Sequence, residues 1–147
     1  MPHDIAVIGA GIMGSAIATR LLERGHHLHV FDLDTAKLDR LAALGAKPAA
    51  SPAAATEAAS FVILSLNHAD IVEAAVFGSD GVAKAATPDR LLIDMSSIDP
   101  AATQRMSARL KDETGMAWLD CPLSGGAPGA SAGRLTVMAG GSEQDFE

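Results

Sequence analysis

Three glycines near the start of the chain have the spacing of a loop that binds phosphate groups. They lie in the run Gly9-Ala-Gly11-Ile-Met-Gly14, between the apolar residues 5–8 and a helix-compatible segment at 15–24. Gly9 permits a tight turn after a strand, and Gly11 has no Cβ that would block a diphosphate. Gly14 lets the following helix pack closely on a sheet, and the helix N-terminus offers free N–H groups and a positive dipole end. The spacing predicts a loop that binds a dinucleotide diphosphate, with contacts from Gly9, Ala10, Gly11, Ile12 and Gly14.

An acidic residue at the end of the second expected strand narrows the choice of dinucleotide. The apolar-rich residues 28–31 end on Asp32, whose carboxylate can accept hydrogen bonds from adenosine ribose hydroxyls. NADP would bring a phosphate to the same place. Two like charges about 4 Å apart repel by roughly 4 kcal/mol at an effective dielectric constant of about 20, and by less once solvent and salt screen them. The alternative role, a helix cap, suits Asp34 better because Asp34 directly precedes a helix expected at 35–44. Asp32 therefore predicts NAD rather than NADP.

Strands and helices alternate along the rest of the chain. Strands are expected at 61–66, 91–95, 116–119 and 135–139, with a short extended piece near Lys47. Helices are expected at 35–44, from Pro52, at 68–77, from Asp99-Pro100 to Thr114, and from Ser142. The nearly continuous apolar runs 61–66 and 91–95 are typical of strands buried on both faces of a parallel sheet. The order predicts a single α/β domain over 1–147, a doubly wound Rossmann-type sheet that binds ligands at the carboxyl ends of its strands.

Composition and charge exclude several classes of function. The 147 residues are 48% hydrophobic and carry a formal net charge of −7, so no basic stripe is available for nucleic acid. No apolar run approaches the length of a membrane span, and the first strand follows Met1 too closely for a signal peptide. The only cysteine, Cys121, cannot form an internal disulfide. We expect a cytoplasmic protein with a reduced thiol and no membrane or nucleic-acid partner.

Histidines give no sign of a metal centre. His26, His27 and His29 gather at the start of the second expected strand, away from the ligand end of the sheet. They have no cysteine or carboxylate partner at metal-ligand spacing, so a solvated edge is expected. His68 is nearer the ligand end but has no recognisable orienting acid.

Four segments, in the same order across essentially the whole chain, resemble the β-hydroxyacid dehydrogenases. This family includes 3-hydroxyisobutyrate dehydrogenase and tartronate semialdehyde reductase (2-hydroxy-3-oxopropionate reductase), with 6-phosphogluconate dehydrogenase as a more distant relative. The segments are Ala6 to His26, Leu64-Ser-Leu-Asn67, Asp94-Met-Ser-Ser-Ile-Asp-Pro100 and Asp120-Cys-Pro-Leu-Ser-Gly-Gly-Ala-Pro-Gly-Ala130. Cys121 stands where alanine is more usual.

The resemblance implies further contacts to the dinucleotide from Leu66, Asn67 and Ser96, with Met13 lying along it. Asn67 can also cap the helix expected at 68–77, and both roles can hold at once. Ser96 can instead bond to the backbone of its own loop. Leu66 and Met13 can equally be packing residues.

The resemblance also implies a substrate site at Ser124, Gly125 and Gly126. A hydroxyl followed by two glycine N–H groups forms a backbone concavity that can hold a small carboxylate. The alternative is a glycine-rich connection between two strands.

Oxidation of a hydroxyl needs a base, and the family uses a lysine on a helix beyond the dinucleotide domain. The chain's own lysines lie in or beside expected surface helices and match no catalytic motif; they are Lys37, Lys47, Lys84 and Lys111. No catalytic residue is therefore assigned within 1–147. We expect the N-terminal domain of a longer, homo-oligomeric enzyme, whose helical C-terminal domain supplies the lysine, and no activity from this chain alone.

The function expected is hydride transfer between NAD and a short β-hydroxy acid, such as 3-hydroxyisobutyrate or glycerate, the latter with tartronate semialdehyde as product. One alternative is an NAD-binding module without catalysis. Another is an NADPH-dependent imine reductase or a 6-phosphogluconate dehydrogenase relative, against which Asp32 argues.

Overall fold

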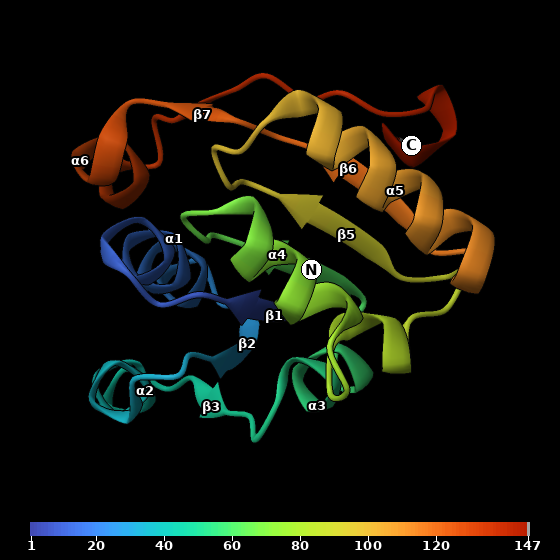
Figure 1. Cartoon of the computed structure of the whole chain (residues 1–147). Coiled ribbons are helices and arrows are strands. Elements are labelled where there is room, and N and C mark those ends of the chain that lie inside the picture. The colour runs from blue at the N-terminus through green and yellow to red at the C-terminus, as the bar shows by residue number, and fades with distance from the viewer. Residues whose placement is uncertain (147) are drawn as a thin grey trace.

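The computed structural model describes residues 1–146 and shows a parallel β-sheet covered by helices on both faces (Figure 1). The six strands lie in the order β3-β2-β1-β4-β5-β6, and every neighbouring pair is parallel. The strands are β1 (Asp4–Ile8), β2 (His27–Phe31), β3 (Lys47–Pro48), β4 (Phe61–Leu64), β5 (Leu91–Asp94) and β6 (Ala117–Asp120). The predicted doubly wound α/β fold is confirmed.

Two helical layers bury opposite faces of this sheet. One layer contains α1 (Ile12–Glu23), α2 (Thr35–Ala43) and α6 (Gly126–Ala132), and the other contains α3 (Pro52–Glu57), α4 (Ala69–Phe77) and α5 (Pro100–Thr114). Alternate side chains of a strand point to opposite faces. In β1, Ile5 and Val7 therefore pack with the first layer, whereas Ala6 and Ile8 pack with the second.

The strand order changes direction between β1 and β4, which is where such sheets bind ligands. The chain moves outward from β1 to β2 and β3, and then returns to place β4 on the other side of β1 (Figure 1). The connections that leave the carboxyl ends of β1 and β4 therefore diverge and leave a crevice between them.

The predicted helix boundaries are confirmed at several caps. The Asp34 carboxylate accepts a hydrogen bond from the Ala36 N–H, and the Ser51 hydroxyl accepts one from the Ala54 N–H. Asp99 caps α5 with Pro100 at the first helical position. Within residues 1–146, no helix combines the length and apolarity needed to span a membrane.

Two predicted strands are at least two residues shorter than expected. β4 ends at Leu64 rather than at residue 66, because the Leu66 N–H bonds to the Ser96 hydroxyl instead of to a neighbouring strand. The strand expected at 135–139 is reduced to β8 (Thr136–Val137), which pairs antiparallel with β7 (Leu123–Ser124) outside the main sheet.

Helix α6 was not predicted from the sequence. Its residues, Gly-Ala-Pro-Gly-Ala-Ser-Ala, have a low intrinsic helix propensity because of two glycines and a proline. Packing forms the helix instead: Ala130 is buried in the same apolar cluster as Ile17 and Ala18 of α1. Two short 3₁₀ segments, at Val82–Ala85 and Glu143–Phe146, complete the chain.

Candidate functional site

The glycine loop brings the start of α1 directly against the end of β1. A Cβ on Gly14 would lie 1.9 Å from the Gly9 carbonyl oxygen, and one on Gly9 would lie 2.2 Å from the Ser65 carbonyl oxygen. Gly9 also has a φ of 101°, which favours glycine. A Cβ on Gly11, by contrast, would meet no atom within 4 Å. Two of the glycines are thus required by the fold, and the third faces open space.

The N-terminus of α1 is free to bind an anion. Gly11 occupies the N-cap position and provides no side-chain cap. The first N–H groups of a helix have no intrahelical partner, so those of the first turn can donate to a ligand at this place. The positive end of the helix dipole adds to the attraction for a diphosphate.

Asp32 fixes the shape of this loop. Its Oδ2 accepts a hydrogen bond from the Ala10 N–H at 2.7 Å, and its Oδ1 accepts one from the Asp34 N–H at 2.8 Å. The Ser15 hydroxyl donates to the Ala10 carbonyl at 2.7 Å, so Ala10 is held on both sides. Each carboxylate oxygen has a second lone pair, which leaves Asp32 able to accept from ribose hydroxyls as well. The bond to Ala10 was not foreseen from the sequence.

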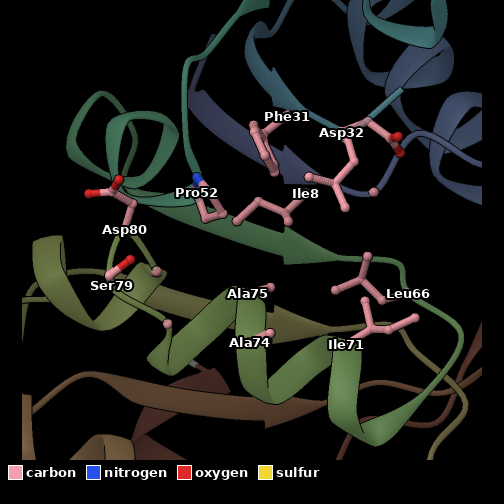
Figure 2. Close-up of a pocket in the computed structure, with 14 residues that line it drawn as sticks. Ile8, Phe31, Asp32, Pro52, Leu66, Ile71, Ala74, Ala75, Ser79 and Asp80 are labelled. Carbon is pink, nitrogen blue, oxygen red and sulfur yellow. The ribbon is translucent and has the colours of Figure 1, made fainter. Parts of the chain in front are cut away.

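A cavity of about 430 Å³ lies beyond the ends of β1 and β2 (Figure 2). Figure 2 shows Phe31 and Ile8 facing Ala74, Ala75 and Ile71 of α4 across this space. Asp32 lies at one end and Asp80 at the other. This larger cavity has apolar walls and acidic ends, which suits a flat base attached to a polyhydroxylated sugar.

A second cavity, of about 180 Å³, lies on the other side of Leu66. It is lined by Met13, Ser65, Leu66, Asn67, Met95, Ser97 and Leu123. Leu66 lines both cavities, and the glycine loop contributes Gly9 to the larger and Met13 to the smaller. The free end of α1 therefore lies between two cavities, as a two-ended dinucleotide requires.

Ser96 is an interior residue rather than a surface one. Ser96 is only 4% exposed, and its hydroxyl accepts a hydrogen bond from the Leu66 N–H at 2.9 Å. Ser96 thus bonds to the loop after β4, not to its own loop backbone. Its neighbour Ser97 lines the smaller cavity instead. A direct contact between Ser96 and a cofactor stays a prediction.

Asn67 is exposed and lines the smaller cavity, but it does not cap α4. The helix begins at Ala69 and His68 occupies the N-cap position, without a side-chain bond. The expected cap role of Asn67 is therefore wrong, and its contact with a dinucleotide stays a prediction.

Three ionisable groups lie together near the carboxyl ends of β5 and β6. Burial, with a smaller contribution from the charge of Asp120, raises the pKa of Asp94 to about 6, against hydrogen bonds from Ser96 that lower it. Burial also raises the pKa of Asp120. The pKa of the buried Cys121 thiol is raised by burial and by the two carboxylates, so the thiol stays protonated and is a poor nucleophile.

The predicted carboxylate site lies at the start of α6. Ser124 belongs to β7, and Gly125 and Gly126 adopt φ values of 126° and 62° as the chain turns into the helix. All three are exposed, and Leu123 directly before them lines the smaller cavity. The alternative, a glycine-rich connection between two strands, also describes this segment, because it joins β7 to β8 and contains α6. Substrate contact at these residues stays a prediction.

Within residues 1–146, no lysine lines either cavity, and no group of three or more His, Cys, Asp or Glu side chains is arranged to hold a metal. Lys84 pairs with Asp80 at 2.9 Å. Asp4 Oδ1 lies 3.5 Å from His27 and 3.4 Å from His29 of β2, a carboxylate neighbour that sequence reasoning did not find. Parallel pairing of β1 with β2 brings Asp4 there.

Residues 4–147 match the family described as the NAD binding domain of 6-phosphogluconate dehydrogenase. The chain is 42% identical to a probable mitochondrial 3-hydroxyisobutyrate dehydrogenase of Dictyostelium discoideum, over 97% of this chain and 44% of that protein. An NAD-dependent L-serine dehydrogenase of Pseudomonas aeruginosa is 41% identical, over 98% and 48%. A 2-hydroxy-3-oxopropionate reductase of Escherichia coli is 39% identical, over 97% and 48%. The predicted resemblance is confirmed, and the chain spans about half the length of these relatives.

Solved structures agree with this assignment of the fold. A Mycobacterium tuberculosis 3-hydroxyisobutyrate dehydrogenase, described with L-serine, superposes with a TM-score of 0.90 at 32% identity, over 99% of this chain and 49% of that one. Psf3, described in complex with NADP+ and 2-OPP, gives 0.91 at 29% identity, over 97% and 50%. An imine reductase from Myxococcus stipitatus, at 0.88 and 23% identity over 99% and 49%, shares the fold alone.

The raised pKa of Asp94 predicts a stability cost at neutral pH. Between about pH 4 and 6 the folded chain keeps a proton on Asp94 that the unfolded chain, with an ordinary pKa of 3.8, releases. The contribution of Asp94 to the free energy of unfolding therefore falls as the pH rises to 6, by at most roughly 3 kcal/mol for about two pKa units. Asp94→Asn lacks this loss. Urea unfolding measures the free energy of unfolding of the variant and of wild type at pH 4 and at pH 7. The difference between the two proteins should shift in favour of the variant at pH 7, and the same difference at both pH values would contradict the prediction.

Proposed function

The chain belongs to the family described as the NAD binding domain of 6-phosphogluconate dehydrogenase, and its relatives include hydroxyacid dehydrogenases. From that premise we propose that it is the cofactor-binding domain of an enzyme that transfers hydride between NAD and a short β-hydroxy acid. The observation that carries the proposal is the uncapped N-terminus of α1, set between two cavities with Asp32 beside it. A nicotinamide dinucleotide supplies or accepts the hydride when bound.

The chain's own residues bind and orient the cofactor in this proposal. The apolar walls of the larger cavity take the adenine, and Asp32 accepts hydrogen bonds from its ribose. Free N–H groups in the first turn of α1 hold the diphosphate across Gly11. The nicotinamide end enters the smaller cavity, where Asn67 can donate and accept and Met13 packs.

The substrate is proposed to be a small β-hydroxy acid held by its carboxylate. Ser124, Gly125 and Gly126 offer a hydroxyl and exposed backbone N–H groups at the start of α6, next to Leu123 of the smaller cavity. Such a contact would orient the hydroxyl-bearing carbon toward the nicotinamide end. The names of the relatives, which include 3-hydroxyisobutyrate, L-serine and 2-hydroxy-3-oxopropionate, support this substrate class.

The base is proposed to be a lysine of a further, helical domain, which would also form a homo-oligomer. Two facts support this: the chain spans about half of its relatives, and no lysine in residues 1–146 lines either of the two cavities beside the glycine loop. Lys84, the lysine closest in sequence to the wall of the larger cavity, is paired with Asp80.

We propose that the carboxylate of Asp32 makes the site prefer NAD over NADP. A 2′-phosphate would meet a carboxylate already fixed by two backbone N–H groups, so Asp32 cannot easily turn away. The relative named as an NAD-dependent L-serine dehydrogenase is consistent with NAD, whereas Psf3 was solved with NADP+.

A test of the proposed function compares the full-length protein with the 147-residue chain. We expect the full-length protein to reduce NAD with 3-hydroxyisobutyrate, glycerate or L-serine, and the chain to bind NAD without turnover. Absorbance of NADH at saturating substrate measures the first, and calorimetry measures the second. Turnover by the chain would place the base within it, and a full-length protein inactive on all short hydroxy acids would favour a binding module without catalysis.

Calorimetry with NAD and NADP tests the role of Asp32. We expect wild type to prefer NAD by about tenfold or more. Asp32→Ala should weaken NAD, because ribose and Ala10 both lose an acceptor, and should bring the two affinities closer together. Asp34→Ala is the matched control: it removes a nearby acid that only caps α2, and should keep the preference. Equal or tighter binding of NADP by wild type would refute the argument from Asp32.

A further inference from the structure

A chain of hydrogen bonds joins the buried Asp94 to the loop between the two cavities. Asp94 Oδ1 accepts from the Ser96 N–H at 2.9 Å, and the Ser96 hydroxyl accepts from the Leu66 N–H at 2.9 Å. Asp94 is 0% and Ser96 4% exposed. Leu66 lines both cavities, and the adjacent Asn67 lines the smaller one. The buried carboxylate is thus two hydrogen bonds away from the wall of the site.

The loop needs this support because it has just left the sheet. The Ser65 N–H still bonds to the Ile8 carbonyl, and the Met95 N–H bonds to the Leu64 carbonyl. At Leu66 the ladder has ended, and the partly buried amide takes its acceptor from the Ser96 side chain. Without that acceptor the amide would have to move toward water, since buried N–H groups are rarely left unpaired.

The buried carboxyl group of Asp94 lowers the stability of the fold, and packing alone does not explain its presence. Asp94 points to the same face of β5 as Leu92, which lies in the apolar cluster with Val62 and Trp118. Within residues 1–146, its Oδ2 has no hydrogen-bond partner. Burial raises its pKa to about 6, so the charged form is disfavoured there. An apolar side chain would avoid these costs, and groups that cost stability are typical of functional positions.

We propose that Asp94 is a positioning residue for the nicotinamide end of the cofactor, acting through Ser96 to hold Leu66, which lines both cavities, and Asn67, which lines the smaller one. The proposal rests on the proposed function in one respect, the assignment of the smaller cavity to the nicotinamide end. Asp94 itself touches neither cavity, so its effect on binding passes through Ser96.

The test compares binding of NADH and of ADP-ribose, which lacks the nicotinamide, to the full-length protein. Asp94→Ala leaves the Ser96 N–H without its acceptor. We expect it to weaken NADH by about tenfold or more and ADP-ribose by less than about threefold, because most of the larger cavity comes from other elements. Asp94→Asn keeps an acceptor for the Ser96 N–H and should restore NADH affinity to within about threefold of wild type. Loss of fold alone would weaken both ligands together.

Two further variants complete the experiment. Asp120→Asn is the matched control: Asp120 lies opposite Asp94 in the next strand, and in the described chain its side chain makes no hydrogen bond to residues 65–67. It should leave the ratio of the two affinities unchanged. Ser96→Ala should show the same selective loss of NADH as Asp94→Ala, and the double variant should be no weaker than Ser96→Ala alone.

Parallel loss of both ligands in Asp94→Ala, without recovery in Asp94→Asn, would overturn the proposal, as would unchanged NADH binding. If Asp94→Ala does not fold, Ser96→Ala decides, and a non-selective effect there overturns the proposal equally. A wild-type protein that binds ADP-ribose as tightly as NADH would instead contradict the assignment of the smaller cavity, which belongs to the proposed function.

Discussion

The close approach of α1 to the end of β1 is the constraint on which the rest of the site depends. The missing Cβ of Gly14 allows it, because that atom would lie 1.9 Å from the Gly9 carbonyl oxygen. The missing Cβ of Gly9 allows the loop after β4 to pass equally close, because that atom would lie 2.2 Å from the Ser65 carbonyl oxygen. The approach brings the free N–H groups of the first helical turn to the switch point of the sheet, between the two cavities. The bond from Ala10 to Asp32 then fixes the loop at that place. The carboxylate that we propose discriminates between cofactors therefore also shapes the loop that we propose binds their diphosphate.

The candidate site is supported by buried polar side chains, although apolar side chains at the same positions would stabilise the fold more. Within residues 1–146, Asp94 is buried with one oxygen unpartnered, and the hydroxyl of Ser96 belongs to a buried residue. Both lie at the carboxyl end of β5, where the strand stops and side chains replace the ladder as partners of the backbone. The stability of the domain comes from the two apolar layers, and part of it is lost at the edge of the sheet where we propose that the ligand binds.

The sequence was sufficient for the features that depend on neighbouring residues. The order of strands and helices, the glycine loop and the caps at Asp34, Ser51 and Asp99 follow from local patterns. It was insufficient where distant segments meet: the bond from Leu66 to Ser96 joins residues 30 apart, and that from Ala10 to Asp32 joins residues 22 apart. Helix α6 escaped prediction because packing against α1 outweighs its poor propensity. The walls that α4 and residues 78–81 give the larger cavity depend on the strand order, which local patterns do not specify.

The most direct test of the central claim is the binding of NADH to Gly11→Val, measured together with thermal unfolding of the same variant. A Cβ at Gly11 would meet no protein atom within 4 Å, and the φ of −68° at this position suits any residue, so the fold should persist. The added methyl groups would occupy the space assigned to the diphosphate. The account predicts loss of NADH binding with an unfolding temperature close to that of wild type. Undiminished binding by a folded Gly11→Val variant would contradict it.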